Sequence, residues 1–277
     1  TNTQPYPGST LINSGSLEDL ININGSTLTN NSGGTITGNL GNTGEVKNNL
    51  GGTITINDES FLNSNSGTII NSGTLIIGFV DALLTNESGG TLTNSNTLTN
   101  NGRLTNEGTL TNNSGGTFTN NNTLNNKSVL INNSGATLIN NSALTNIHNK
   151  TLSNAGTLIN NGGATLDNLG TLNHSGTLTN NGALINTSFI TRRGISLPSS
   201  FISNAGSVID GSGSYTQSSG ENATTTINGI MSQASMTIIG GVLNGSGTIN
   251  ADVNIGDAGS VNPGNSPGAL TINGYFT

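Results

Sequence analysis

The chain has 277 residues, with six Lys and Arg against thirteen Asp and Glu and a formal net charge of −7. Hydrophobic residues make up 30% of it and aromatic residues 3%, a composition that by itself is closer to disordered chains than to globular cores. The few basic residues form no patch, so nucleic acid is not expected as a partner. No apolar run is long enough to insert into a membrane, and the absence of Cys excludes a disulfide framework and a thiolate metal site.

Residues 1–25 are expected to form an N-terminal arm followed by a first, irregular turn. The opening segment Thr1–Gly8 contains two prolines and does not follow the pattern of the residues after it. An arm of this kind is able to add a strand to a neighbouring molecule, so Thr1 and Tyr6 are candidate assembly residues.

Residues 26–190 form an array of short repeats, which is loose at first and strict after Leu92. Two apolar residues divide each twenty-residue repeat, as Leu104 and Leu110 do, and this predicts three short strands per turn. A repeat of this length cannot bury its apolar side alone, so it must stack on its neighbours as a β-solenoid. The repeated apolar positions, each preceded by Thr, are Leu98, Phe118, Leu138, Leu158 and Leu178.

The same repeats predict buried amides. In the unit 109–113, strand alternation directs Leu110 and Asn112 inward and both threonines outward, while Asn113 turns the corner. An inward amide can hydrogen-bond to the amides of the coils above and below it, which predicts Asn ladders beside the Leu ladders. In the twenty-residue register the predicted ladder consists of Asn100, Asn120, Asn140, Asn160 and Asn180.

Residues 191–240 lose the regular motif, which predicts irregular turns or an excursion from the solenoid. Irregular segments on a rigid scaffold are a common place for recognition, so Arg192, Arg193, Phe201 and Tyr215 are candidate recognition residues. In the alternative that we favour, the aromatic side chains fill and cap the narrowing end of the solenoid.

Residues 241–277 return to strand-like units and end in the run 259–276, which contains Pro-Gly-Asn-Ser-Pro-Gly at 263–268. This run resembles the closing passenger segment of autotransporter-type bacterial surface proteins. The Thr-Leu-Thr-Asn-Asn-Gly units are similar to the repeats of filamentous-haemagglutinin-like adhesins. The resemblance implies a single-stranded, right-handed parallel β-helix at the bacterial cell surface or outside the cell.

Enzymes with a β-helix fold need two or three carboxylates, or a carboxylate with Arg or Lys, in one groove. The candidate pairs here are Glu18 with Asp19, Asp58 with Glu59, and Arg192 with Arg193. Adjacent residues of a strand point to opposite faces, so none of these pairs converges by itself. We therefore expect no catalytic residues and no enzyme activity.

The sequence also gives no metal or cofactor site. His174 stands in a position where the ladder predicts Asn, and His148 precedes a corner. The segment 210–213, and Asp252 with Asp257, lack the regular acidic spacing of a calcium site.

Paired outward threonines raise the alternative of ice binding, because a flat face of a β-helix can present them as a lattice. The pairs are Thr97 with Thr99, Thr117 with Thr119, and Thr177 with Thr179. Ile139 and Ile159 interrupt the row formed by the second Thr of each pair. Thr is also the usual outward residue throughout, so this alternative is not favoured.

These observations predict a secreted, non-enzymatic structural protein whose solenoid assembles end to end into an extracellular or cell-surface fibre. The ends of a solenoid present unpaired backbone groups, which favour pairing with further copies of the chain. An adhesin that binds glycans or cells through residues 191–240 is the runner-up. The candidate assembly residues are Thr1, Tyr6, Leu270, Ile272, Tyr275 and Phe276.

Overall fold

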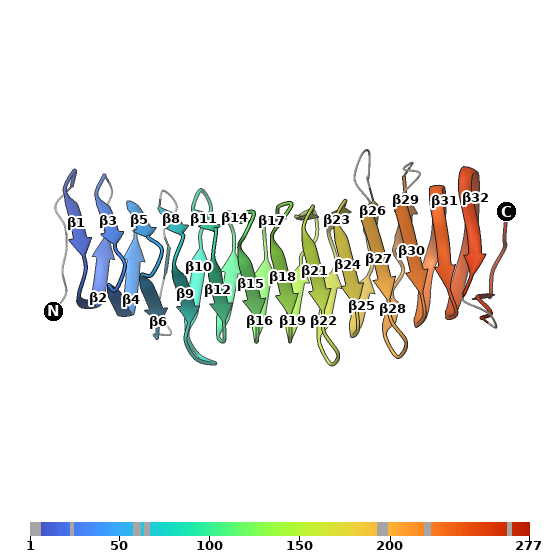
Figure 1. Ribbon diagram of the computed structural model, residues 1–277, viewed down its shortest axis with the longest axis horizontal. Helices are drawn as coiled ribbons and strands as arrows, with labels where there is room; N and C mark the ends of the chain where they lie inside the picture. The colour runs from blue at the N-terminus through green and yellow to red at the C-terminus, as the bar shows by residue number, and fades with distance from the viewer. Residues whose placement is uncertain are drawn as a thin grey trace. The chain divides into compact units, whose positions relative to one another are not determined.

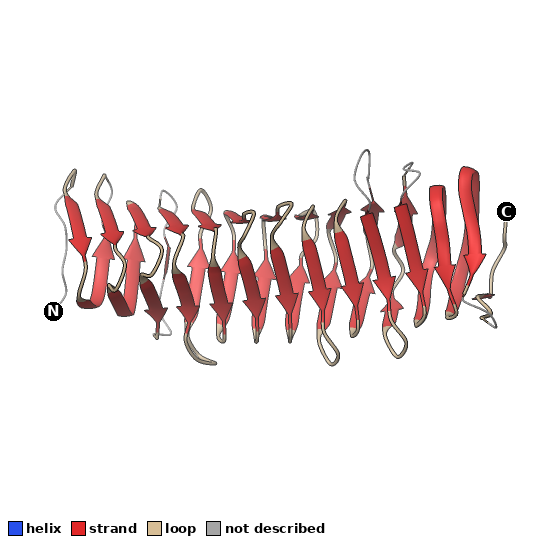
Figure 2. Ribbon diagram, in the orientation of Figure 1, coloured by secondary structure: helices blue, strands red, loops and turns tan. Residues whose placement is uncertain are grey.

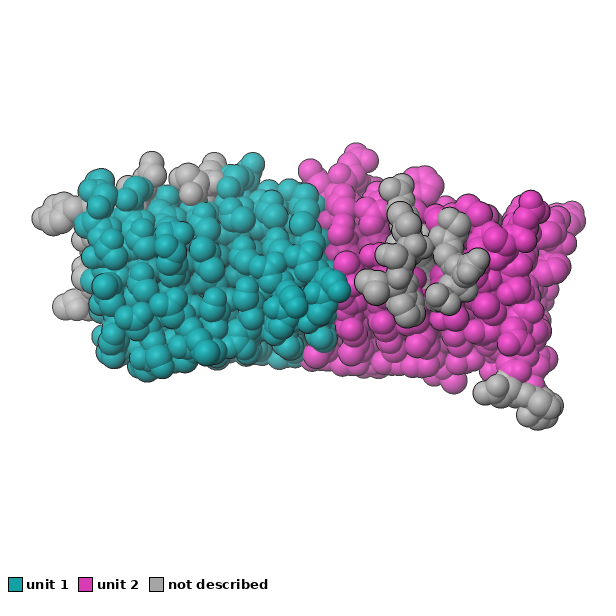
Figure 3. All heavy atoms as spheres, turned by 45° about the horizontal axis from the view of Figure 1, so that its top comes forward, with its two compact units in different colours: residues 1–138 teal, residues 139–277 magenta. Residues whose placement is uncertain are grey.

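The computed structural model describes residues 7–22, 25–57, 62–63, 67–192, 199–218, 223–264 and 268–277. These residues form strands, turns and loops, with no helix among them (Figure 2). The chain divides into two compact units, Thr1–Leu138 and Ile139–Thr277 (Figure 3). The boundary falls within β18 (Thr137–Asn140).

The strands of unit 1 are β1 (Thr10–Asn13), β2 (Ser16–Asn22), β3 (Thr27–Asn30), β4 (Thr35–Asn42), β5 (Glu45–Asn48), β6 (Thr53–Ile56), β7 (Leu62–Asn63), β8 (Thr68–Asn71), β9 (Thr74–Ile77), β10 (Leu83–Asn86), β11 (Thr91–Asn94), β12 (Thr97–Asn100), β13 (Arg103–Asn106), β14 (Thr109–Asn112), β15 (Thr117–Asn120), β16 (Thr123–Asn126) and β17 (Val129–Asn132).

The strands of unit 2 are β19 (Ala143–Asn146), β20 (Thr151–Asn154), β21 (Thr157–Asn160), β22 (Thr165–Asn168), β23 (Thr171–His174), β24 (Thr177–Asn180), β25 (Ala183–Asn186), β26 (Phe189–Arg192), β27 (Ser199–Ser203), β28 (Val208–Asp210), β29 (Ser214–Gln217), β30 (Ala223–Ile227), β31 (Ile230–Gly245), β32 (Thr248–Pro263) and β33 (Thr271–Ile272).

Unit 1 is a parallel β-solenoid with three sheets, in which each strand pairs with the corresponding strand of the next coil (Figure 1). Sheet 1 contains β6, β9, β12 and β15. Sheet 2 contains β1, β3, β5, β8, β11 and β14, and ends with β17. Sheet 3 contains β7, β10, β13 and β16. The predicted three short strands per turn are therefore present.

The first coils of unit 1 differ from this prediction because β2 and β4 each run through a corner, from sheet 1 into sheet 3. Their register shifts between Glu18 and Leu20, where Asp19 adopts a φ of 49°. The Asp19 carboxylate accepts a hydrogen bond from the backbone N–H of Asn39 at 3.0 Å. A bulge of this kind bends a strand without ending it, which explains why one long element replaces two short ones.

Unit 2 is also a parallel β-solenoid with three sheets. Sheet 4 contains β21, β24, β27 and β30, sheet 5 contains β20, β23, β26 and β29, and sheet 6 contains β19, β22, β25 and β28. In its last coils, β31 and β32 each have 16 residues, and β31 pairs in turn with β28, β29 and β30. The described parts of the stretch 191–240 thus include paired strands.

The interior of both units follows the predicted alternation. Leu98 pairs with Phe118 in sheet 1, and Leu158 pairs with Leu178 in sheet 4. These four side chains and Leu138 are fully buried. Since full burial of a Leu or Phe side chain contributes about 1.5–3 kcal/mol, one apolar residue per strand gives each coil a thin but sufficient core.

The Asn ladders lie beside this core. In sheet 2 of unit 1, each side-chain amide donates to the side-chain oxygen of the next Asn at 2.7–2.9 Å. The same amides donate a second hydrogen bond to backbone carbonyls, as Asn112 does to Thr137 at 2.8 Å. In sheet 1, Asn100 donates to Asn120 at 2.7 Å. The ladder of sheet 2 consists of Asn13, Asn30, Asn48, Asn71, Asn94, Asn112 and Asn132.

Unit 2 contains an inner and an outer row of amides. In the inner row, Asn140 donates to Asn160 and Asn160 donates to Asn180, both at 2.8 Å. At the corner outside them, the next residue in sequence, Asn161, donates to Asn141 at 2.6 Å. The inner row is fully buried and the outer row is in contact with solvent. The predicted inward ladder is therefore confirmed, and a second ladder runs along the corner.

At some tight corners glycine avoids a collision with the preceding coil, whereas the equivalent corner between β18 and β19 carries Ser142. A Cβ atom added at Gly182 would overlap the carbonyl oxygens of Ala164 and Asn161. At the wide corner that contains Gly162, the nearest such atom is 3.9 Å away. Glycine therefore allows the close approach of successive coils at corners such as Asn181-Gly182.

The neighbours Asn160 and Asn161 give a matched test of the inner ladder. Replacing Asn160 with Ala removes the acceptor of Asn140 and the donor to Ala183, whose carbonyl oxygen lies 2.8 Å away. Buried groups without partners destabilise a protein, so N160A is expected to lower the free energy of unfolding by about 2–4 kcal/mol. N161A removes only a solvent-exposed bond and is expected to change it by less than about 0.5 kcal/mol. Equilibrium denaturation in urea measures both, and equal losses would contradict the role of burial.

Candidate functional site

The edge strand β1 has the geometry most relevant to assembly. The N–H groups of Thr27 and Asn31 donate to the carbonyl oxygens of Ser9 and Asn13 at 3.0 and 2.8 Å. The N–H and C=O of one strand residue point to the same side, and successive residues alternate. The backbone groups of Ile12 therefore point to the opposite edge, where no strand of the described chain pairs with β1. Its side chain is 62% exposed.

The last described segment of unit 2 also lies on an edge. β33 pairs in parallel with β32, and Phe276 forms a bridge with Val253. The N–H of Val253 donates to the Tyr275 carbonyl oxygen at 2.7 Å. The side chains of Tyr275 and Phe276 are 79% and 56% exposed.

The other candidate assembly residues are distributed as follows. Ile272 belongs to β33 and Leu270 lies just before it, both partly buried. Thr1 and Tyr6 lie outside the described residues.

The candidate recognition residues are not brought together at the surface. Phe201 and Tyr215 are fully buried, with ring centroids 5.0 Å apart in a T-shaped contact. The Tyr215 hydroxyl hydrogen-bonds to Thr225 Oγ1 at 2.5 Å inside the coil. Because a buried ring cannot contact a ligand, this corrects the assignment of Phe201 and Tyr215 to recognition and fits the alternative that they fill the interior. Arg192 is the last residue of β26, and Arg193 lies outside the described residues.

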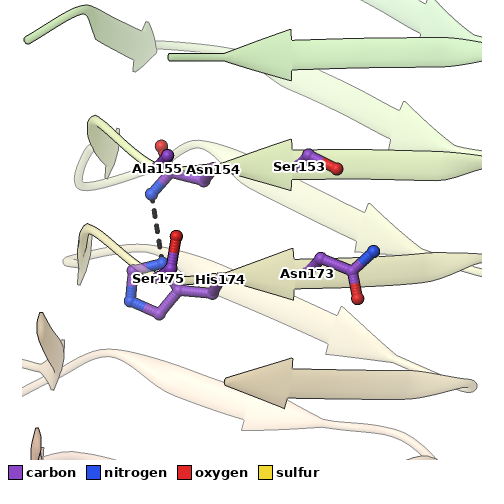
Figure 4. Close-up of a pocket in the computed structure, with 6 residues that line it drawn as sticks. All are labelled: Ser153, Asn154, Ala155, Asn173, His174 and Ser175. Atoms are coloured by element: carbon purple, nitrogen blue, oxygen red, sulfur yellow. Dashed lines mark hydrogen bonds between the residues drawn. The ribbon is translucent and has the colours of Figure 1, made fainter. Parts of the chain in front are cut away.

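A shallow, open pocket of about 210 Å³ lies over β20 and β23 of sheet 5 (Figure 4). Its lining carries hydroxyl, amide and imidazole groups and no carboxylate. A pocket with this lining offers hydrogen bonds but no acid and base pair. The lining residues are Ser153, Asn154, Ala155, Asn173, His174 and Ser175.

His174 has a structural role in this pocket. It pairs with Asn154 in the ladder register, and the Asn154 amide lies 3.1 Å from His174 Nδ1 (Figure 4). His174 Nε2 lies 3.0 Å from the Ser200 carbonyl oxygen. An amide donates and a carbonyl accepts, so these partners assign the neutral tautomer with its proton on Nε2. The imidazole thus accepts from one coil and donates to the next, as a ladder Asn does.

We expect that H174N will retain stability, because a carboxamide again supplies one acceptor and donors. H174L is expected to lower the free energy of unfolding by about 1–3 kcal/mol, since the Ser200 carbonyl and one Asn154 contact lose their partner. Thermal denaturation of the two variants measures the difference. Equal stability of H174N and H174L would contradict the ladder role.

Of the candidate catalytic pairs, the structure describes both members of Glu18 with Asp19 alone, and these two do not converge. Glu18 pairs across strands with Thr37, while Asp19 is held at the bulge by Asn39. Asp58 and Glu59 lie outside the described residues. Within the described ranges, no three His, Cys, Asp or Glu residues gather in a way that could hold a metal ion. The described residues also contain no helix that is long and apolar enough to cross a membrane.

Among the described carboxylates, Asp167 has a pKa that departs clearly from its usual value. It faces outward from β22, between Thr145 and Ile185 of the neighbouring strands. Its Oδ1 atom is buried without a hydrogen-bond partner among the described residues. Burial raises the pKa of Asp167, and the nearby His148 lowers it by a smaller amount.

A raised carboxyl pKa means that the folded state binds the proton more tightly than the unfolded state. Ionised Asp167 therefore costs stability above its folded pKa, and the cost disappears below its unfolded pKa of about 3.9. D167N is expected to be more stable than the wild type at neutral pH, with the difference lost near pH 3. Urea denaturation across pH measures this, with the exposed D210N of the same sheet as the control. A D167N advantage that persists unchanged at pH 3 would contradict the burial effect.

Comparison with known proteins adds no argument to the fold assignment. No protein-family model matches the chain, and no curated protein matches it. Among solved structures, it is similar to the crystal structure of a TibC-catalysed, hyper-glycosylated TibA55-350 fragment. The two share 17% identity with a TM-score of 0.32, over 100% of this chain and 97% of the other. The fold assignment rests on the strand register within each unit and does not depend on this similarity.

Proposed function

We propose that the chain is a non-enzymatic structural protein of the cell surface or extracellular space, which assembles by pairing of coils between copies. The observation that carries the proposal is the edge of β1 at which no described strand pairs, where the backbone groups of Ile12 point outward. The partner is a second copy of the chain, since its edge strand β33 presents a parallel edge that fits the edge of β1.

The composition of the solenoid supports a passive role. The interior of the coils is filled by apolar and amide side chains, which leaves no room for a substrate. Charged side chains are sparse, and the two ion pairs described, Lys47 with Glu45 and Lys127 with Glu107, lie at the surface. Exposed ion pairs contribute little to stability, so these charges serve solubility better than chemistry.

Substitution at Ile12 tests the proposal. I12P removes an N–H that points away from β3, so it blocks pairing at the free edge without removing a bond between β1 and β3. We expect filaments of the wild-type chain by negative-stain electron microscopy, and their loss in I12P. I12T is the matched control, because it keeps the N–H and places the usual outward residue there.

Light scattering coupled to size-exclusion chromatography measures the mass of the assemblies in solution. Circular dichroism checks that I12P retains its β structure. A wild-type chain that stays monomeric at high concentration would overturn the proposal. Filaments of I12P as abundant as those of I12T would also overturn it.

Adhesion is a second candidate, and one observation favours it. On sheet 6, Val208 pairs with Ala183 on one side and with Ile230 on the other. Val208, Ile230 and the nearby Ile185 are 39%, 48% and 37% exposed. An exposed apolar row of this kind is a typical contact surface, and it replaces Phe201 and Tyr215 as the place for recognition. Binding to a glycan array by a chain that forms no filaments would favour this function.

A further inference from the structure

We propose that the outward side of sheet 1 in unit 1 binds ordered water, with an ice surface as its ligand. The part of this side that we call the threonine face consists of two outward positions on each of five successive coils, from β4 to β15. On the coil before them, Ser16 and Glu18 of β2 pair with Thr35 and Thr37. The threonine face contains nine threonines and one isoleucine: Thr35, Thr37, Thr53, Thr55, Thr74, Ile76, Thr97, Thr99, Thr117 and Thr119.

The register makes this face a regular lattice. Thr35, Thr53, Thr74, Thr97 and Thr117 pair one after another, so one file is threonine without interruption. In the second file, Ile76 alone replaces Thr. Strand geometry sets the spacing at about 4.8 Å between coils and about 6.6 Å along each strand. The oxygen atoms of ice surfaces repeat at similar distances, so bound water on this face can continue an ice lattice.

The lattice is kept although the coils differ in length. The coils that begin at Thr35, Thr53, Thr74 and Thr97 have between 18 and 23 residues before the next aligned Thr. The corners absorb the additional residues, and the outward positions of the sheet stay in line. The hydroxyl array is therefore a property of the sheet and does not depend on a strict twenty-residue period.

The hydroxyls of this face are available to water. Thr97 Oγ1 makes one long hydrogen bond, to Asn96 at 3.4 Å. The other eight hydroxyls make no hydrogen bond within the described part of the chain. In sheet 4 of unit 2, by contrast, the Ser200 hydroxyl donates to Thr177 Oγ1 at 3.4 Å.

Side-chain chemistry separates ice from other repeating ligands. The ten positions of the threonine face include no charged residue, and the carboxylate of Glu18 lies at its border beside Thr37, which argues against an anionic polymer. It also has no aromatic residue on which a sugar ring could stack. A hydroxyl and a methyl group at every position fit a surface that orders water without binding it tightly.

The neighbouring sheet 2 serves as an internal comparison. Its outward positions include Thr91 with Thr93 and Thr109 with Thr111. Glu45 and Lys47 form an ion pair there, and Val129 with Ile131 follow the last Thr pair. The uncharged threonine lattice therefore extends over more coils in sheet 1.

Thr99 and Thr111 provide a matched pair for the test. Each is the third residue of a Thr-Leu-Thr-Asn strand, and each lies between one Thr and one Ile of the adjacent coils. Wild-type protein is expected to shape ice crystals and to show thermal hysteresis in a nanolitre osmometer. T99K is expected to lose this activity, because a charged side chain holds the face away from ice, whereas T111K retains it.

A substitution that places Thr at every position of the second row is expected to raise the ice-binding activity that T99K lowers. I76T is expected to increase thermal hysteresis, while I70T on sheet 2 leaves it unchanged. Wild-type protein that neither shapes ice nor slows its recrystallisation would overturn the proposal, as would equal losses in T99K and T111K. None of these substitutions lies on β1, so filament formation is tested independently.

Discussion

The hydrogen bond between stacked side-chain amides is the interaction on which the whole structure depends. A chain with so few apolar residues buries polar groups in every coil, and each would destabilise the fold if it lacked a partner. In the ladders, each carboxamide accepts from one coil and donates to the next, as Asn106 does between Asn86 and Asn126 at 2.8 and 2.9 Å. The amides thereby make a polar interior compatible with a stable fold.

The same bonds fix register. A shift of one residue would place Leu outside and Thr inside, and would also remove each amide from its partners. Coil length is not fixed in this way, because additional residues are accommodated at corners. This explains how β1, β3 and β5 stay aligned with later strands although their coils have 17 and 18 residues instead of twenty.

The contrast between a fixed strand register and a variable coil length also explains what the sequence could and could not predict. The Leu and Asn ladders and the position of His174 follow from strand alternation alone, and all are present. The alignment of Thr35, Thr53 and Thr74 with Thr97 was missed, because a strict twenty-residue period does not hold before Leu92. A search for the recurring pattern of Thr, one apolar residue and a second outward residue would have revealed this alignment. The burial of Phe201 and Tyr215 agrees with the favoured alternative that these side chains fill the interior, although the local pattern alone did not exclude their exposure.

The exceptions to the ladder show which property is required. Gln233 accepts from Asn186 at 2.6 Å and donates to the Gly211 carbonyl at 3.2 Å, and it lies where the register of β31 shifts. A longer side chain is thus accommodated in the ladder at a point where the backbone register is irregular. His174 fulfils the same function with two ring nitrogens.

Ser203 shows the limit of this tolerance. It takes the place opposite Asn180, but its side chain is too short to continue the row, and it bonds to Ser207 at 2.7 Å instead. The Asn180 amide keeps its bonds to the Gly182 and Val208 carbonyls, which are of the kind that Asn140 makes to Ser142 and Thr165. The structural requirement is therefore an acceptor and a donor at a fixed distance from the coil wall, and not asparagine as such. Because this requirement lies entirely inside the coil, the outward positions are free to carry threonine lattices or apolar rows without loss of the fold.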